Sequence, residues 1–298
     1  MKESFQKKIT RSKIKLNDDN YYGNEADWQY MSVSQYKNFL KCPAAALAKL
    51  KGDWQPSSDP IALLVGNYVH SYFEDLAVHE KFKEENKNRM FSSRKPYGLL
   101  KDFKIAEQMI DRLIVEDAFL NLYQGEKEVI VTGELFGVEW KGKIDCLNLE
   151  DDYFVDIKTS KDIHERKWNE VYGQRCTFIE NFGYVLQMAV YCELLKQQCG
   201  KDFVPIIAAV SKQTPSEAKL ITLDEDKMSF ELINLRDNID RIQRIKMGEE
   251  KPEACGTCEY CRANQRITGF TSMNDCLIIS IYLGNLRWGF SPRLRMNW

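Results

Sequence analysis

Two carboxylates and a lysine lie close together between Gly142 and Lys158. The stretch reads GKIDCLNLEDDYFVDIK, in which two short predicted strands flank an acidic turn. Asp145 ends the first strand, and Asp156 and Lys158 project from one face of the second. If the strands pair, the three side chains converge at the edge of a sheet. Carboxylates are ligands for Mg²⁺, which activates water and stabilises developing charge. The arrangement therefore suits phosphodiester hydrolysis, with the lysine orienting the water or neutralising the phosphate.

A third carboxylate is predicted beside Asp145 by the strand pattern that precedes it. The segment EVIVTGELFGVEWKGKIDCLNL alternates with a period of two, which is typical of a β-hairpin with Phe136 and Gly137 in its turn. Counting outward from that turn puts Glu128 opposite Asp145. Glu134 falls nearer the turn and is the reserve candidate, because a register shift or a bulge would change the count.

The other elements are predicted from hydrophobic periodicity. Helices are expected from a cap at Ser32 or Ser34 up to Pro43 and over residues 61–80, 105–122, 180–199 and 225–247, strands over 203–210 and 219–223, and a loop over 81–104. His70 lies on the second of these helices. Gln187 and Tyr191 lie four residues apart on a later helix and so share a face. The order predicts an α/β fold with a mixed central sheet flanked by helices.

The sequence Cys255-Gly-Thr-Cys258-Glu-Tyr-Cys261 forms a second candidate site. Three thiolates spaced C-x2-C-x2-C on a glycine-bearing loop suit an iron–sulfur cluster. A fourth ligand is required, and Cys42 is the candidate. A structural Zn²⁺ bound by the same four thiolates is the alternative, and the sequence does not separate the two.

Composition restricts the setting in which these sites act. The 298 residues carry a net charge of −2, so any DNA-binding surface must be local. No apolar run is long enough to span a membrane, and the first residues lack the apolar region of a secretory signal, which predicts a cytoplasmic protein without membrane association. We expect a flexible basic arm over 1–27, a catalytic domain over 28–262 that ends in the cysteine cluster, and a tail over 263–298 without an assigned role.

In this order the motifs resemble the PD-(D/E)XK nucleases, in the RecB-like branch that includes phage exonucleases of the exodeoxyribonuclease VIII type. Asp145 matches the first acid, and Asp156-Ile157-Lys158 matches the (D/E)XK element, with Asp at the second acid. GNYVHSYFE matches the histidine-bearing helix, and GYVLQMAVY matches the Q-x-x-x-Y helix. The resemblance covers residues 30–262.

The resemblance implies a restriction-endonuclease-like core and a role for each matched residue. The implied ligands of Mg²⁺ or Mn²⁺ are Asp145, Asp156, His70 and the carbonyl of Ile157, with Glu128 from the hairpin count in support. Lys158 would assist the attacking water. Gln187 would contact DNA or position the lysine, and Tyr191 would stack or hydrogen-bond near the scissile strand. Cys42 and the three later cysteines would hold a [4Fe–4S] cluster that joins the two ends of the domain.

The function expected from these features is Mg²⁺-dependent exonucleolytic hydrolysis of DNA with little sequence specificity. The resemblance also suggests phage or prophage recombination beside a single-strand annealing protein, and a homo-oligomer that threads DNA would make the reaction processive. The alternatives are a structure-specific endonuclease, a catalytically inactive DNA-binding or assembly component, and a redox protein. Asp145, Asp156 and Lys158 together argue against an inactive component, and nothing in the sequence resembles an electron-partner site.

Overall fold

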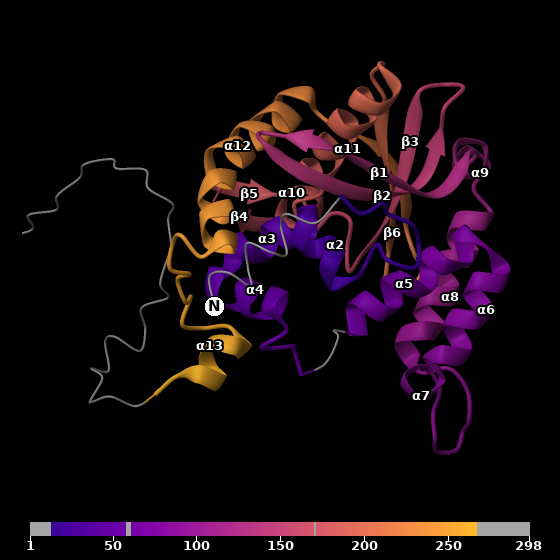
Figure 1. Cartoon of the computed structure of the whole chain (residues 1–298). Coiled ribbons are helices and arrows are strands. Elements are labelled where there is room, and N and C mark those ends of the chain that lie inside the picture. Colours follow the sequence, from indigo (N-terminus) through magenta and orange to yellow (C-terminus); the bar gives the residue numbers. More distant parts are fainter. Residues whose placement is uncertain (1–12, 58–60, 170, 267–298) are drawn as a thin grey trace, which may run out of the picture.

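A five-stranded mixed sheet forms the centre of the computed structural model, which describes residues 13–57, 61–169 and 171–266 (Figure 1). The strands are β1 (Glu126–Leu135), β2 (Val138–Asn148), β3 (Tyr153–Ser160), β6 (Val204–Ser211) and β7 (Ala218–Thr222), in the order β1-β2-β3-β6-β7. Strands β3 and β6 are parallel, and the other neighbours are antiparallel. Helices cover both faces, so the predicted α/β architecture is confirmed.

The hairpin of β1 and β2 follows the predicted register. Phe136 and Gly137 form its turn with φ angles of 53° and 73°, and a type I′ turn requires positive φ at both positions. The register of the two strands is constant along the whole hairpin. Glu128 therefore lies opposite Asp145, as the count from the turn predicts.

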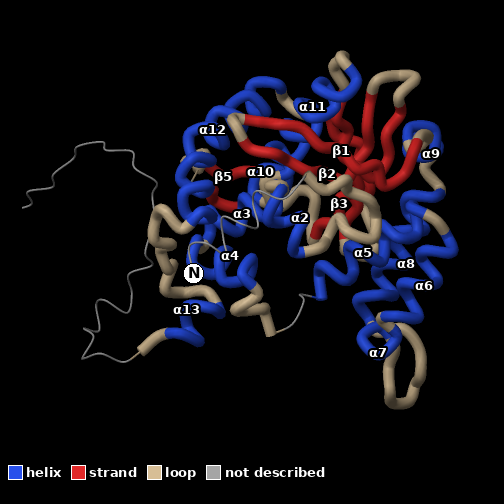
Figure 2. Tube along the Cα trace, viewed as in Figure 1, coloured by secondary structure: helices blue, strands red, loops and turns tan. Residues whose placement is uncertain are grey.

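One face of the sheet packs against four helices that come from both ends of the domain. These are α3 (Val33–Lys41), α4 (Pro43–Lys51), α11 (Tyr184–Cys199) and α12 (Glu225–Met247). Their apolar side chains and those of the sheet form one continuous core, in which Trp140 of β2 is fully buried. The short helix α10 (Phe178–Asn181) and the ribbon of β4 (Lys167–Asn169) and β5 (Gln174–Cys176) lie beside α3 and α12 (Figure 2).

The opposite face packs against a second helical layer with a core of its own. The helices are α5 (Ile61–Glu74), α6 (Leu76–Glu85), α7 (Lys87–Met90), α8 (Lys101–Ile114) and α9 (Asp117–Leu122). The predicted helix over 61–80 is two helices, because Asp75 caps a new one by accepting from the N–H groups of Ala77 and Val78. The loop predicted over 81–104 is confirmed only over residues 91–100, because α6 and α7 extend to Met90 and α8 begins at Lys101. Charged residues dominate the composition of the stretch, yet Met90 and Phe103 are fully buried in this core.

Residues 13–27 are packed on the domain, in contrast to the flexible arm predicted over 1–27. Helix α2 (Asn24–Gln29) buries Ala26, and Lys141 of β2 forms an ion pair of 2.7 Å with Asp27. The sequence analysis missed this segment because its buried contacts are with strands more than a hundred residues away. Residues 1–12 lie outside the described residues. At the other end, α13 (Glu259–Asn264) carries the last cysteine, and most of the tail predicted over 263–298 also lies outside the described residues.

Candidate active site and cysteine site

Asp145 and Asp156 lie at the point where β2 and β3 separate. Within the described strands, the last pair of the β2–β3 ladder is Cys146 with Val155, immediately before the two acids. Asp145 Oδ2 accepts a hydrogen bond of 2.7 Å from the N–H of Ile157, so a carboxylate occupies the place where ladder bonding stops. Both acids are buried, at 7% and 1% exposure. A strand fork therefore presents two carboxylates to one small volume.

His70 and Glu128 approach Asp145 from two other elements. Helix α5 brings His70 Nδ1 to 3.1 Å from Asp145 Oδ2. Glu128 stands on β1 with a φ of 53°, a left-handed conformation that is uncommon for a residue with a side chain. One ligand atom from each of the three residues lies within 4.8 Å of the other two. These three side chains are therefore close enough to share a metal ion.

Lys158 and Gln187 both contact the second acid. Side chains alternate between the two faces along β3. Val155 and Ile157 pack into the core on one face, so Asp156 and Lys158 point to the other face, toward α11. The Lys158 ammonium forms an ion pair with Asp156 Oδ2. Gln187 Nε2 donates to Asp156 Oδ1 at 3.1 Å. The family resemblance implies that Gln187 contacts DNA or positions Lys158, whereas in the structure its partner is Asp156.

Tyr191 lies between Gln187 and strand β2. Gln187 Nε2 lies at hydrogen-bond distance, 3.1 Å, from Tyr191 Oη. The Tyr191 side chain is only 7% exposed, and its ring lies against Gly142 of β2, where a Cβ atom would stand 2.4 Å from Cε1. Gly142 is therefore required for this contact, which the spacing of residues in the sequence does not reveal. Burial of this kind fits a tyrosine that positions Gln187.

Burial and neighbouring charges shift the pKa values in the site in opposite directions. Burial opposes the charged form of Asp145, but His70, Lys158 and the Ile157 N–H outweigh it, so the pKa of Asp145 is lowered. Burial raises the pKa of Asp156 to about 6, with Asp145 adding to the effect against Lys158. Burial also opposes a charged His70, yet the Asp145 carboxylate raises its pKa. The two acids thus differ in proton affinity before any metal binds.

Lys158 itself is held in its charged form. Burial disfavours the ammonium, but the carboxylates of Asp156 and Asp145 outweigh burial and raise the pKa of Lys158. The ammonium also lies 4.7 Å from the centre of the Tyr184 ring, at the start of α11. Lys158 therefore acts near neutral pH as a cation.

A lysine that the sequence analysis did not single out partly neutralises Glu128. Lys143 Nζ lies 3.0 Å from Glu128 Oε2 and 3.2 Å from Asp18 Oδ1. Burial and the neighbouring Asp145 nevertheless raise the pKa of Glu128. Glu128 is therefore a shared carboxylate, and Lys143 competes with any metal ion for it. The hairpin pattern contains the signal, because Lys143 pairs with Ile130 and is therefore a diagonal neighbour of Glu128 across the two strands.

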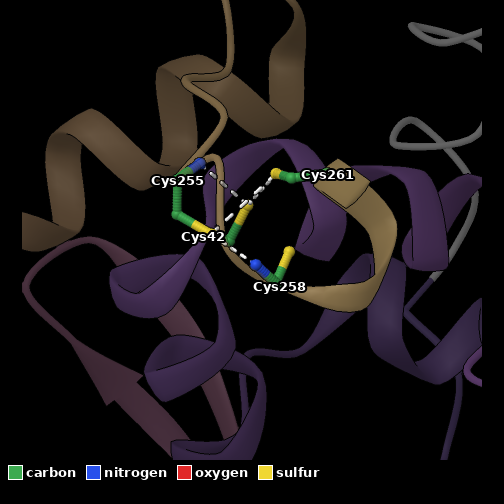
Figure 3. Close-up of side chains that lie close together, drawn as sticks. All are labelled: Cys42, Cys255, Cys258 and Cys261. Atoms are coloured by element: carbon green, nitrogen blue, oxygen red, sulfur yellow. Dashed lines mark hydrogen bonds between the residues drawn. The ribbon is translucent and has the colours of Figure 1, made fainter. Parts of the chain in front are cut away.

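Four cysteine sulfurs gather at the second site (Figure 3). The Sγ atoms of Cys42, Cys255, Cys258 and Cys261 lie within 4.8 Å of one another. Cys42 caps the start of α4, and the other three lie on the loop and short helix after α12. Backbone N–H groups point at the sulfurs: the N–H of Cys258 donates to Cys255 Sγ at 3.4 Å, and the N–H of Cys255 to Cys42 Sγ at 3.5 Å. The structure thus brings together all four predicted residues.

The donors at both sites fit metal binding. Two sulfur–sulfur distances are given by Cys42 to Cys261 at 3.6 Å and Cys255 to Cys261 at 3.9 Å. A tetrahedral ion with metal–sulfur bonds of about 2.3 Å requires about 3.8 Å between sulfurs. At the strand fork, Asp156 Oδ2 is buried in its ion pair with the Lys158 ammonium. Carboxylate oxygens, as offered there by Asp145, Asp156 and Glu128, are suitable ligands for Mg²⁺ or Mn²⁺.

The comparisons with known proteins agree with this fold and site. A family model described as "PDDEXK-like domain of unknown function (DUF3799)" matches residues 32–264. A solved structure from Eubacterium rectale, named "Putative exonuclease", is 35% identical, covers 89% of this chain and 99% of its own, and superposes with a TM-score of 0.82. A second structure, SSO0001, is 14% identical over 87% of this chain and 90% of its own, with a TM-score of 0.32, too low to support any argument. No curated protein sequence matches.

The chain belongs to the DUF3799 family of PDDEXK-like domains. The resemblance drawn from the motifs is thereby confirmed, and the restriction-endonuclease-like fold with it. Family membership and the Eubacterium rectale structure together support a nuclease function in general terms. Among the described residues, no helix combines the length and apolar character needed to cross a membrane.

Proposed function

We propose that this protein is a divalent-metal-dependent deoxyribonuclease that hydrolyses phosphodiester bonds from the ends of DNA. The observation that carries the proposal is the convergence of Asp145, Asp156 and Lys158 at the fork between β2 and β3. His70, 3.1 Å from Asp145, completes the set of groups. Buried acids beside a buried lysine are costly to a fold and are common where chemistry requires them.

The proposed ligands of Mg²⁺ or Mn²⁺ are Asp145, Asp156, the carbonyl of Ile157 and His70, with Glu128 in support. The cluster of His70, Glu128 and Asp145 and the buried carboxylate of Asp156 support this assignment. When bound, the ion would lower the pKa of a water molecule and stabilise charge that develops on the phosphate. DNA is the proposed substrate because the chain belongs to a PDDEXK-like family and resembles an exonuclease structure. We expect little sequence specificity, because phosphate contacts carry no sequence information.

The other residues of the candidate active site would bind the substrate or orient the metal ligands. Lys158, whose pKa is raised, would stay charged and hold the phosphate or the attacking water by its ammonium. Gln187 would fix the orientation of Asp156 through its hydrogen bond to Oδ1. We assign Tyr191 a positioning role for Gln187, since its burial leaves little surface for stacking on DNA.

We propose that Cys42, Cys255, Cys258 and Cys261 bind a structural metal group that joins the ends of the domain. Motif spacing and the family resemblance favour a [4Fe–4S] cluster. Sulfurs 3.6 and 3.9 Å apart suit a single Zn²⁺, because thiolates on four different irons would lie farther apart. Metal analysis and the visible absorption spectrum of protein purified without oxygen distinguish the two, because zinc gives no visible band.

We favour an exonuclease over an endonuclease because of the RecB-like motifs and the name of the Eubacterium rectale structure. By the same resemblance, the reaction would belong to phage or prophage recombination, with a single-strand annealing protein as partner and a homo-oligomer as a route to processivity. Co-purification with the annealing protein of the same locus and the mass of the native particle in solution test these two points.

The test of the function compares an end-labelled linear duplex with closed circular DNA in the presence of Mg²⁺. The variants are Lys158→Ala and, as a matched control, Lys49→Ala, which removes an exposed lysine on α4. The proposal predicts that the wild type and the control shorten linear DNA only, and that Lys158→Ala is inactive. Cleavage of circular DNA would show that the protein is an endonuclease and would contradict the proposed preference for DNA ends. Absence of any cleavage by protein with its metal group intact would leave only the inactive DNA-binding component.

A further inference from the structure

A second lysine stands near the active site without a carboxylate partner. Lys37, on α3, extends across Gly183 to the start of α11, and a Cβ atom on that glycine would stand 2.9 Å from Lys37 Cδ. Its ammonium donates to the carbonyl oxygen of Phe182 at 2.8 Å. Within the described residues, no carboxylate oxygen lies within ion-pair distance of this ammonium. Among the described residues, its one hydrogen-bond acceptor is thus a neutral carbonyl.

The charge of Lys37 is poorly compensated by its surroundings. Burial, followed by the charges of Lys158 and Lys41, lowers the pKa of Lys37 to about 8, while Asp156 and Glu231 act more weakly in the opposite direction. Helix α11 adds no counter-charge, since the beginning of a helix carries partial positive charge. A partly buried cation without a carboxylate partner is suited to binding an anion such as a phosphate.

Lys37 and Lys158 face the same aromatic ring. The two ammonium groups lie 5.7 Å and 4.7 Å from the centre of the Tyr184 ring. They are therefore at most about 10 Å apart, the sum of these distances, which corresponds to about three nucleotides of one DNA strand at about 3.4 Å of rise each. A strand whose scissile phosphate meets Lys158 would bring a neighbouring phosphate within reach of Lys37.

The charges of the surrounding groove indicate that a phosphate would bind at Lys37 and not along the whole groove. Lys37, Phe182 and Tyr184 line one part of a groove of 1080 Å³ that extends to Cys255. The two arginines of the groove are already paired: Arg241 with Glu250 and Glu253, and Arg244 with Glu250. The groove as a whole is close to neutral, because its lysines and arginines (Lys37, Lys41, Arg241 and Arg244) face as many glutamates (Glu180, Glu231, Glu250 and Glu253), and it does not attract a polyanion along its whole length. Lys37 is distinguished from the other cations by its place at the Tyr184 ring, which Lys158 also faces.

Accepting the proposed function, we infer that Lys37 is a positioning residue that binds a backbone phosphate of the cleaved strand next to the scissile phosphate. The contact would fix the register of the strand on Lys158. It would add binding free energy that is equal in the ground state and the transition state, so its loss raises KM more than it lowers kcat. Each phosphate bound by a cation also contributes to the salt dependence of binding.

The experiment measures binding and turnover separately. Binding of a fluorescein-labelled linear duplex is followed by anisotropy with Mg²⁺ over a range of salt concentrations, in an Asp145→Asn background that keeps the DNA intact. Lys37→Gln is compared with Lys37→Arg and with Lys49→Gln, an exposed lysine of the next helix. Steady-state hydrolysis is measured on the same variants with Asp145 present.

The inference predicts that Lys37→Gln weakens binding about fivefold to tenfold and lowers the slope of log Kd against log salt by about 0.7 to 0.9, the value for one phosphate. The KM should rise by a similar factor with kcat within about threefold. Lys37→Arg should restore the slope, and Lys49→Gln should match the parent. An unchanged slope with a lower Tm in Lys37→Gln would instead show that the lysine only holds Phe182, and would overturn the inference.

The same data separate this inference from the proposed function. If DNA binds with a salt slope that depends on Lys37 but is never cut, the phosphate site stands and the nuclease proposal fails. If DNA is cut and Lys37→Gln behaves as the parent in both assays, the nuclease proposal stands and the inference fails. If the wild type neither binds nor cuts DNA, the inference fails together with the function on which it rests.

Discussion

Replacing Gly142 by alanine tests how the second acid is held in place. The new Cβ atom would stand 2.4 Å from Cε1 and 2.8 Å from Cδ1 of Tyr191, and 3.1 Å from Cγ2 of Val131. Contacts shorter than about 3.4 Å are rare, so the ring must retreat by about 1 Å. Tyr191 and Asp156 each lie 3.1 Å from the amide nitrogen of Gln187. A displaced ring therefore lengthens one of these two contacts.

Two effects of Gly142→Ala can be sized from this geometry. Overpacking of a close-packed core costs about 1–3 kcal/mol. Each kcal/mol lowers Tm by about 2–4 °C in a domain of this size. A weakened hydrogen bond to the Asp156 carboxylate is worth about 1.5–3 kcal/mol, which corresponds to about a 10-fold to 100-fold loss of kcat if it is lost fully in the transition state.

The assays are thermal unfolding and hydrolysis of end-labelled DNA, with Gly66→Ala as the matched control. Gly66 lies inside α5, one turn before His70, and the nearest atom to its added Cβ is Thr159 Oγ1 at an ordinary 3.8 Å. Alanine is the better helix former, so this control should keep its activity and hold or raise its Tm.

The decisive comparison repeats Gly142→Ala in a Tyr191→Ala background. With the ring removed, the added methyl group should cost little stability, because the contact that it violates is gone. If Gly142→Ala costs the same in both backgrounds, the clash with Tyr191 is not the cause and the reasoning above is refuted. Activity that is unchanged in Gly142→Ala despite a lower Tm would refute only the link through Gln187.

Three further outcomes follow from the two sites and the core. Lys246 donates to the carbonyls of Asp27 and Trp28, and burial lowers its pKa to about 8. From pH 8 to about 10.5 the unfolded chain binds the extra proton, so denaturant unfolding should show wild-type stability rising relative to Lys246→Met, by at most roughly 3 kcal/mol. Mg²⁺ at a hundredfold excess over its Kd should stabilise the metal-free wild type by about 2.7 kcal/mol in thermal unfolding, and Asp145→Asn should abolish this shift. Cys42→Ser should lower both the metal content measured by elemental analysis and the Tm, whereas Cys199→Ser, an exposed cysteine, should change neither.

The parts of the site that follow from local periodicity could be predicted from the sequence. The two-residue alternation of apolar and polar side chains, together with a turn at Phe136 and Gly137, determines which residue lies opposite Asp145. The structure has the same register. The four-residue spacing of Gln187 and Tyr191 likewise determines that they share a helix face. In these cases a few neighbouring residues suffice, because the backbone geometry of a strand or helix relates them directly.

The parts that depend on distant packing could not be predicted. Lys37 meets the start of α11 across 145 residues of sequence, and nothing in its neighbours indicates that contact. The helices within residues 81–104 could not be predicted for the same reason, since charged residues outnumber the apolar ones that these helices bury. Residues 13–27 have a polar composition, yet a partly buried ion pair between Asp27 and Lys141 joins their end to β2.

The cysteine site and the candidate active site share one element, which gives the metal group a role beyond stability. Helix α3 carries Lys37 on its side toward α11 and ends at Cys42, whose sulfur lies 3.6 Å from that of Cys261. A metal group at the cysteines closes a loop of more than 200 residues, and such a closure removes conformational freedom from the unfolded chain. In the folded chain a metal bound there would hold the C-terminal end of α3 against the segment after α12. Because α3 also packs on α11, such a metal would constrain the distance between Lys37 and the first turn of α11, where Tyr184 faces Lys158.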